Sequence, residues 1–401
     1  MFRNSDGRCV MLDWLLIILS LAGLFMIVDT CALERSAGDG NIFGRAIKQA
    51  LCCLALFVVY QLCSGRFRKL EHLKALKKWT PVFLFAACAV LLAVVFFGAE
   101  VNGAVRWMRF AGQSIQPSEI FKPLYALGVA WYVTEQKNCL PTLNYLVLML
   151  LFGIFAAVGI SNMSTGIQYG FVLIIGLWIG GMENKYLIML GVAGVILGAA
   201  VVLCGDEFRQ MRIAAWLDPV AYASQEGNQV VISLASISSA GLIGCGYGNG
   251  LAKYIIPEPC NDYIFTTIAE EFGCIGCIVV AALYGMLFYT AGRIISESRN
   301  RYCRILCFCC MGFILFQALL NISVTLNMLP STGVCLPFIS YGVSSLTGCY
   351  ALVFLMQLAS MSRDEAPKAL KIHFKKRNGS PELRRSMSAA DMYKRNVRNG
   401  R

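Results

Sequence analysis

Charged residues are scarce in this chain. Asp, Glu, Lys and Arg make up only 14% of its 401 residues, whereas hydrophobic residues make up 57%, and the mean hydropathy is +0.63. Soluble domains carry about 25% charged and about 45–50% apolar residues, so an ordinary soluble domain is excluded. The apolar residues come in long blocks, as expected for a chain that dissolves in lipid. At about 20 apolar residues per spanning helix, the length leaves room for roughly ten spans and no separate soluble domain of normal size.

The net charge of +12 is concentrated in two segments that lie beside apolar blocks. Segment 65–78 holds six Lys or Arg residues against one Glu, and the tail 362–401 holds twelve against four acidic residues. Basic segments beside spanning helices are typical of cytoplasmic faces, so the charge indicates topology and not nucleic-acid binding. The two histidines, His72 and His373, lie in these same segments. Chemistry at the outer face would therefore rely on carboxylates, lysine, arginine or hydroxyls.

The eighteen cysteines do not follow a metal-binding pattern. Most lie within apolar blocks, where a thiol behaves as a small hydrophobic group. The run CRILCFCC at 303–310 contains no histidine and no regular CxxC pairing, which argues against a zinc site. Four cysteines fall in or near expected outer loops, and the sequence leaves any pairing among them open: Cys204, Cys245, Cys260 and Cys335.

Ten apolar blocks have the length of spanning helices, which predicts an all-α integral membrane domain over residues 1–361. With the N-terminus inside, both basic segments fall on the inner side, and the acid-rich segment 205–264 falls outside. An even number of spans then places both termini in the cytoplasm, including the basic tail 362–401. The blocks cover residues 12–32, 46–64, 80–98, 119–135, 141–161, 166–182, 186–204, 265–292, 303–328 and 342–361.

The outer loop 205–264 is much longer than the other connections, and such long loops are usually functional or disordered. Its apolar, glycine-punctuated composition argues against disorder. Phe208, Met211, Ala215 and Trp216 recur at helical spacing, which predicts an amphipathic helix lying at the membrane surface.

A second group of polar residues surrounds the outer loop 99–118. Arg106 and Arg109 flank Trp107 there, and Gln116 leads into a helix that carries Glu119 and Lys122 on one face. Snorkelling arginines in an aromatic belt and an ordinary helix start would also explain this pattern. Burying a charged pair at the edge of the bilayer nevertheless costs free energy, so such a pair usually has a function.

Three features in the second half of the chain each have alternative interpretations. The glycines of segment 241–250 suit either a phosphate-cradling loop or a turn-rich connector. Asp262 lies just before a span and Glu270 and Glu271 lie inside it, where acids usually carry function but can also serve helix packing. The later Pro-, Gly- and Ser-rich segment 327–346 would, in isolation, also suit the re-entrant loop of a transporter.

The motifs together resemble those of the SEDS family, the FtsW/RodA/SpoVE group, over about residues 12–361. The segments that carry the resemblance occur in order: VRWMRF, QPSE, NMST, GNQVVISLASISSAGLIGCGYG, PEPCNDYIF, EEFG, LPSTG and LPFISYG. The resemblance implies ten spans with both termini inside, in a multi-pass protein of the bacterial cytoplasmic membrane. It also implies a peptidoglycan glycosyltransferase that polymerises lipid II at the outer face, paired with a class B penicillin-binding protein and other divisome or elongasome membrane proteins.

The same resemblance assigns roles to individual residues. Asp262 matches the family's essential aspartate and is expected to be catalytic. Six residues are expected to bind the diphosphate or sugars of the substrate: Arg106, Gln116, Glu119, Lys122, Gln229 and Lys253. Six more are candidates for a structural or functional role: Asn162, Glu270, Glu271, Ser340, Tyr341 and Ser344. Asn162 stands where the family usually has an aspartate, and Ala240, Ala269 and Val343 replace usual glycines.

These residues fit the inferred reaction. Transfer between lipid-linked sugars needs a base for the acceptor hydroxyl and cations for the departing diphosphate, and Asp262 with Arg and Lys would supply both. A divalent cation, Mg²⁺ or Mn²⁺, is a further candidate for the diphosphate, although no ligand cluster marks its site. Two other functions fit the same sequence, namely a lipid II flippase and a non-catalytic scaffold of the division or elongation machinery.

Overall fold

A computed structural model describes residues 8–30, 44–66, 70–101, 104–110, 113–135, 140–203, 207–224 and 227–361. The predicted tail 362–401 lies outside this part of the chain. Within it, a helix coincides with each of the ten predicted spans. These helices are α1 Val10–Thr30, α2 Gly44–Arg66, α3 Leu70–Phe97, α5 Lys122–Glu135, α6 Pro141–Ser161, α7 Met163–Ile179, α8 Asn184–Leu203, α12 Ile264–Glu297, α13 Arg301–Thr325 and α14 Val343–Met361.

The apolar blocks account for this all-helical membrane fold. Seven of the helices in the described segments are long and apolar enough to cross a membrane, namely α1, α2, α3, α6, α12, α13 and α14. Helix α5 has 14 residues and α7 has 17, so both are shorter than a typical span. The helical membrane fold is therefore confirmed, whereas the count of ten spans and the side of each terminus stay predictions.

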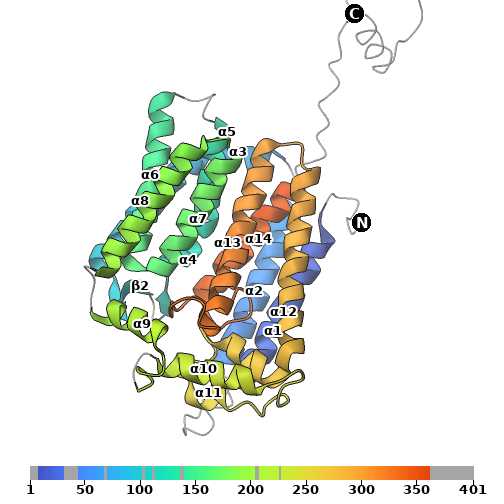
Figure 1. The fold of residues 1–401 in the computed structure, drawn as a ribbon. Coiled ribbons are helices and arrows are strands. Elements are labelled where there is room, and N and C mark those ends of the chain that lie inside the picture. The colour runs from blue at the N-terminus through green and yellow to red at the C-terminus, as the bar shows by residue number, and fades with distance from the viewer. Residues whose placement is uncertain are drawn as a thin grey trace, which may run out of the picture. The chain divides into compact units, whose positions relative to one another are not determined.

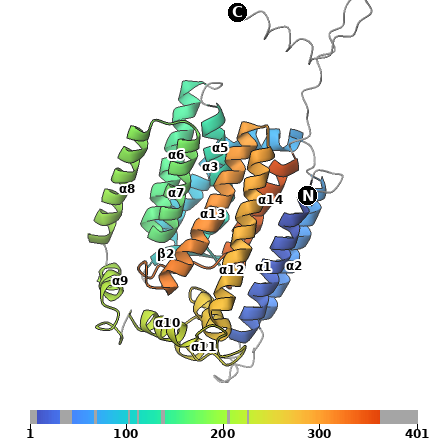
Figure 2. The ribbon, with the colours of Figure 1, turned by 45° about the vertical axis from the view of Figure 1, so that its right-hand side comes forward.

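Helix α13 lies at the centre of the bundle and packs against α5, α7, α12 and α14, while α8 and α1 lie at opposite edges (Figures 1 and 2). It contains four of the eighteen cysteines of the chain. Cys303, Cys307 and Cys310 are fully buried among apolar neighbours. They act as small hydrophobic side chains that let the helices approach closely, as predicted.

The long predicted outer loop folds against one end of the bundle. It forms α9 Glu207–Leu217, α10 Asn228–Ser239 and α11 Ala252–Ile255. These helices lie at the same end as strand β2 Ala104–Phe110 in both views (Figures 1 and 2), and we call this the loop end. Helix α9 confirms the predicted helix, and the indole of Trp216 donates a 3.1 Å hydrogen bond to the carbonyl of Asn327. Its position at a membrane surface stays a prediction.

The segment between α3 and α4 is a small antiparallel sheet. Strand β1 Ala99–Val101 pairs with β2 Ala104–Phe110, which pairs with β3 Gln113–Ile115. A one-turn helix, α4 Pro117–Ile120, follows and starts with proline, which suits a first helical turn. The sheet connects the loop end to α4 and α5, which carry Glu119 and Lys122.

The charge pattern makes a testable prediction about topology. A reporter that is active only in the cytoplasm should work when it is fused after Lys78 or Arg401, because both positions lie in strongly basic segments. It should fail when fused at Gly250, in the loop end. Reporter activity at Gly250 would show that the loop end lies in the cytoplasm and that the predicted topology is wrong.

Candidate functional site

Asp262 lies at the loop end, directly before Tyr263, the N-cap residue of α12. Its side chain is half-buried, and its backbone carbonyl accepts a 2.8 Å hydrogen bond from the side-chain amide of Asn321 on α13. Its Oδ1 lies 3.9 Å from the thiol of Cys335. The backbone of Asp262 is therefore held against α13, and its carboxylate lies beside the loop that follows α13.

The segment 326–342, which contains the LPFISYG motif, packs back into the bundle. Phe338 and Ile339 are buried, and a Cβ added at Gly23 of α1 would lie 2.4 Å from the carbonyl oxygen of Phe338. The hydroxyl of Ser340 accepts a 2.7 Å bond from the amide of Leu336, which closes a tight turn. The amide of Tyr341 donates to the carbonyl of Cys260 at 2.9 Å. The motif thus forms a rigid wall beside the residues that precede Asp262.

A buried ion pair lies next to this wall. The ammonium of Lys122 is 2.8 Å from both carboxylate oxygens of Glu119 and 2.6 Å from the side-chain oxygen of Gln317. Only 1% of Lys122 and 5% of Glu119 is exposed. The amide of Gln317 continues the network by donating to the carbonyl of Cys335 at 2.9 Å. Through Gln317 and Cys335, the ion pair is linked to Asp262.

The remaining predicted residues of the first loop join the same region. The backbone amide of Gln116 donates a 3.0 Å bond to the hydroxyl of Ser344, at the start of α14. The side-chain amide of Gln116 donates to Ser118 at 3.3 Å. The predicted residues that the structure brings together are therefore Gln116, Glu119, Lys122, Asp262, Ser340, Tyr341 and Ser344. The side chain of Arg106 lies outside the described residues.

Three residues of this site were not predicted: Gln317, Asn321 and Cys335. Gln317 and Asn321 lie four residues apart in an otherwise apolar helix, a spacing that places both on one face. That spacing could have identified them. Burial raises the pKa of the Cys335 thiol well above its usual range, and the carboxylates of Asp262 and Glu119 raise it further. The thiol is therefore neutral at neutral pH and does not act as a nucleophile.

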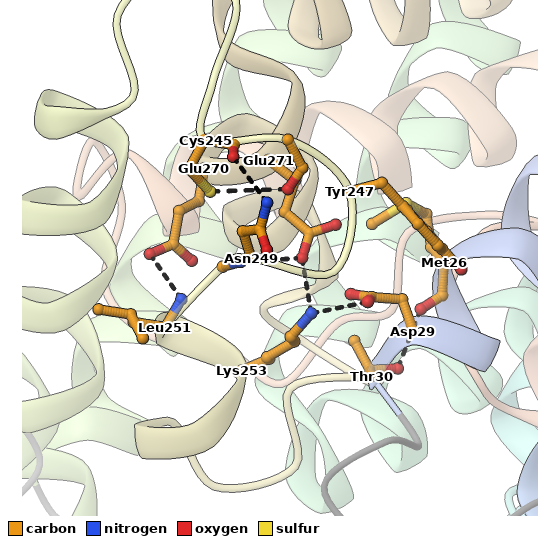
Figure 3. Close-up of polar contacts among 12 residues, drawn as sticks. Met26, Asp29, Thr30, Cys245, Tyr247, Asn249, Leu251, Lys253, Glu270 and Glu271 are labelled. Atoms are coloured by element: carbon orange, nitrogen blue, oxygen red, sulfur yellow. Dashed lines mark hydrogen bonds and ion pairs between the residues drawn. The ribbon is translucent and has the colours of Figure 1, made fainter.

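Lys253 lies in a different environment from the one predicted (Figure 3). Its side chain is fully buried, and its ammonium lies 2.6 Å from Oδ1 of Asp29 on α1 and 2.7 Å from Oε1 of Glu271 on α12. Burial lowers the pKa of Lys253, but the hydrogen bonds to the two carboxylates outweigh burial and raise it overall. Asp29, Lys253 and Glu271 form what we call the Lys253 cluster. In this structure its ammonium is enclosed by the protein, and the predicted contact of Lys253 with a diphosphate stays a prediction.

Lys122 is also enclosed by the protein. Its ammonium is held by Glu119 and Gln317, and only 1% of the residue is exposed. The pair holds α4 and α5 against α13, whereas the predicted contact of Lys122 and Glu119 with substrate stays a prediction.

The glycine segment 241–250 is a connector that fits closely around α12. The amides of Cys245 and Gly246 donate to the carbonyls of Glu270 and Glu271, both at 3.0 Å. A Cβ added at Gly244, whose φ is +81°, would lie 2.3 Å from the carbonyl oxygen of Glu271, so only glycine fits. These amides are engaged by the protein, which favours the connector over a phosphate-binding loop.

Glu270 and Glu271 have structural partners. The carboxylate of Glu270 accepts 3.0 Å bonds from the amides of Leu251 and Ala252, at the start of α11 (Figure 3). Glu271 accepts a 3.2 Å bond from the amide of Gly250 in addition to the ammonium of Lys253. These contacts favour the helix-packing interpretation of the two acids over a direct role at the substrate.

Gln229 is half-buried on α10. Ser233, four residues further along the same helix, fixes α10 to the bundle. The hydroxyl of Ser233 lies 2.6 Å from that of Thr266 on α12 and donates to the carbonyl of Thr325 at 2.9 Å. The structure therefore gives α10 a fixed position at the loop end, whereas the predicted contact of Gln229 with substrate stays a prediction.

Asn162 caps the N-terminus of α7, where its side-chain oxygen accepts a 3.3 Å bond from the amide of Thr165. Aspartate caps a helix about as well as asparagine. In an assay of the expected glycan synthesis, Asn162→Asp should therefore give a rate similar to wild type, with no new pH dependence when rates are measured across the pH range. A large gain in rate would instead show that Asn162 weakens a carboxylate function of this position.

A metal ion has no evident ligand set here. In the part of the chain that the structure describes, no group of three or more His, Cys, Asp or Glu side chains could hold a metal ion.

This architecture defines a polytopic α-helical membrane protein with a half-buried carboxylate at the end of one spanning helix and a buried ion pair behind it. The chain belongs to the FtsW/RodA/SpoVE family, whose pattern, described as "Cell cycle protein", matches residues 10–365. It is thus a multi-pass protein of the bacterial membrane.

Several curated proteins are similar over most of the chain. One from Borreliella burgdorferi is 30% identical over 367 residues, which cover 89% of this chain and 97% of the relative. One from Geobacter sp. is 31% identical over 354 residues, which cover 86% and 94%. Both are named "Probable peptidoglycan glycosyltransferase FtsW".

Solved structures confirm the fold. A chain from a study titled "Structural coordination of polymerization and crosslinking by a peptidoglycan synthase complex" superposes with a TM-score of 0.69 at 21% identity, covering 90% of this chain and 99% of that one. The rod shape determining protein RodA of Thermus thermophilus superposes with a TM-score of 0.64 at 20% identity, covering 88% and 97%.

Proposed function

We propose that this chain is a peptidoglycan glycosyltransferase that polymerises lipid II into glycan strands at the outer face of the cytoplasmic membrane. The observation that carries the proposal is the position of Asp262. Its carboxylate is half-buried at the loop end beside the thiol of Cys335, and its backbone carbonyl is held by Asn321. We infer that a membrane-embedded substrate presents its sugars at this level. Family membership and the names of the relatives support the same reaction.

In the proposed reaction, the Asp262 carboxylate takes the proton from the attacking sugar hydroxyl. The hydroxyl oxygen then bonds to the anomeric carbon of the second lipid-linked sugar, and the bond from that carbon to the diphosphate breaks. The electron pair of the broken bond leaves with the diphosphate on its lipid. We assign the stabilisation of this leaving group to Arg106, on β2 at the loop end. A divalent cation, Mg²⁺ or Mn²⁺, on the diphosphate stays a proposal, since such an ion would take ligands from the substrate phosphates as well as from the protein.

The experiment that tests this function separates synthesis from transport. The purified chain, together with a class B penicillin-binding protein, is incubated with lipid II in detergent, where there is no membrane to cross. We expect glycan strands to lengthen. Failure to lengthen them under these conditions, combined with lipid II movement across vesicle membranes, would favour the flippase.

A scaffold makes a different prediction in cells. If the chain only recruits other division or elongation proteins, an Asp262→Asn variant that keeps its partners will still support growth. If the chain is the polymerase, this variant will not replace the wild type. Growth on the variant alone would therefore overturn the enzymatic proposal.

We further propose that the partner is a bitopic class B penicillin-binding protein whose single span packs between α12 and α13. An apolar groove of about 320 Å³ lies there. Ala281 and Gly285, four residues apart on α12, line it together with Ala318 of α13. Small residues at this spacing let helices approach closely in lipid, where packing drives their association. The solved synthase complex, which combines polymerization with crosslinking, supports such a partner.

Filling the groove should prevent partner binding. A Cβ added at Gly285 meets open space, so Gly285→Leu should fold normally while its side chain occupies the groove. We expect co-purification of the partner to fall at least about tenfold, because close helix packing is lost. Glycan synthesis should fall with it. Gly191→Leu on α8 is the matched control, since Gly191 also faces open space but lies on another helix. If both variants co-purify equal amounts of the partner, this groove is not part of the interface.

A further inference from the structure

The Lys253 cluster contains more acid than base. Its one ammonium lies between the carboxylates of Asp29 and Glu271, of which 5% and 0% is exposed. Each carboxylate uses one oxygen for Lys253. The other oxygens, Oδ2 of Asp29 and Oε2 of Glu271, are buried without a hydrogen-bond partner. With both acids ionised, one negative charge would remain uncompensated in a site closed to water.

The neighbouring groups do not supply the missing positive charge. Glu270, the next acid on α12, is satisfied by the amides of Leu251 and Ala252. Tyr247 donates its hydroxyl hydrogen to the carbonyl of Phe25 and stacks on the Phe25 ring at a centroid distance of 4.2 Å. Two further titratable groups lie nearby. One is Tyr254, whose ring centroid is 5.6 Å from the Lys253 ammonium. The other is the thiol of Cys245; burial raises its pKa, and the two glutamates raise it further. A proton held between Asp29 and Glu271 removes the excess charge and gives a donor to one of the unpaired oxygens.

The cluster is linked mechanically to Asp262. Lys253 lies on α11, and its neighbours Ala252 and Ile256 form a small buried apolar cluster with Tyr263. Tyr263 directly follows Asp262. Because Lys253 ties α11 to α1 and to α12, its ion pairs determine where this apolar cluster, and with it Asp262, is held.

We propose that Lys253 is a positioning residue for Asp262, and that it is held by Asp29 and Glu271 as a carboxyl pair that shares one proton. The proposal rests on the function proposed above, in which Asp262 is the base. It replaces the expected contact of Lys253 with the diphosphate by an indirect role. The neutral cluster fastens the segment that ends at Asp262 to two spanning helices.

Two variants distinguish this role in a lipid II polymerisation assay with the partner present. Lys253→Met leaves an uncompensated buried charge and loosens α11, so kcat should fall about 10²-fold, the typical effect of a misplaced catalytic group. KM for lipid II should change little, because Lys253 does not touch substrate. Asp29→Asn preserves the hydrogen bonds of a protonated Asp29, so kcat should stay within about threefold of wild type.

The pH profile tests the shared proton. In the wild type, raising the pH removes this proton, restores the excess negative charge and loosens the cluster, so polymerisation falls at alkaline pH. Asp29→Asn has no proton to lose at this position and should keep its rate to higher pH. If the polymerisation rate of Asp29→Asn falls at the same alkaline pH as that of the wild type, the proposal of a shared proton is wrong. This test does not depend on whether Lys253→Met folds.

Rescue and control variants complete the test. The triple variant Lys253→Met, Asp29→Asn, Glu271→Gln contains no buried charge in the cluster and should recover part of the lost kcat. Lys185→Met, at an exposed ion pair with Glu183, should have no effect. A raised KM with unchanged kcat in Lys253→Met would overturn positioning in favour of substrate contact. An inactive wild type would instead contradict the proposed function, so the two failures are distinguishable.

Discussion

Asp262→Asn is expected to lower glycan polymerisation by about 10²–10⁴-fold, the usual contribution of a general base. The amide preserves the size of the side chain but does not accept the proton of the attacking hydroxyl. The backbone contact that fixes Asp262, from Asn321 to its carbonyl, does not depend on the carboxylate. Folding, membrane insertion and partner binding should therefore survive.

The measurement is glycan synthesis and partner co-purification on the same preparation of the variant. Asp218→Asn is the matched control, because Asp218 also lies in the long loop but is exposed and accepts a bond from the amide of Ala221. It should retain its activity. Synthesis by Asp262→Asn at the wild-type rate would exclude Asp262 as the base, whereas loss of both synthesis and partner binding would make its role structural.

The positions of the helices could be predicted from the sequence because hydrophobic blocks of spanning length have few alternative folds in lipid. The sheet at 99–115 could not be predicted in the same way. Its strands β1 and β3 have three residues each, too short for an alternating pattern to stand out. The motif residues around Asp262 were identified by resemblance, and the structure explains them by the turn at Ser340 and the contact of Tyr341 with Cys260.

The roles of the lysines could not be predicted, because they depend on contacts between distant parts of the chain. Lys253 pairs with Asp29, which lies 224 positions earlier in the sequence. Lys122 pairs with Gln317, which lies 195 positions later. The expected contacts of both lysines with substrate come from the family resemblance. Only the fold shows that both ammonium groups are enclosed by protein acceptors.

Lys122→Met is expected to destabilise the protein by about 3–5 kcal/mol, the typical effect of removing one partner from a buried ion pair. Its ammonium is the donor for both Glu119 and Gln317, and the variant leaves the Glu119 carboxylate buried without its cation. Because Glu119 lies on α4 and Gln317 on α13, the contact between these helices should loosen first. The midpoint of thermal unfolding of the purified protein in detergent should therefore fall clearly.

The double variant Lys122→Met, Glu119→Gln separates lost charge balance from lost packing. It removes both charges, so it should recover much of the stability, since replacing a buried pair by neutral groups is often close to neutral. Lys185→Met serves as the control, because its pair with Glu183 is exposed and contributes little. If Lys122→Met unfolds at the wild-type temperature but loses polymerisation with a raised KM for lipid II, Lys122 contacts substrate after all. If the double variant is no more stable than Lys122→Met, the pair acts through its packing and not through its charge.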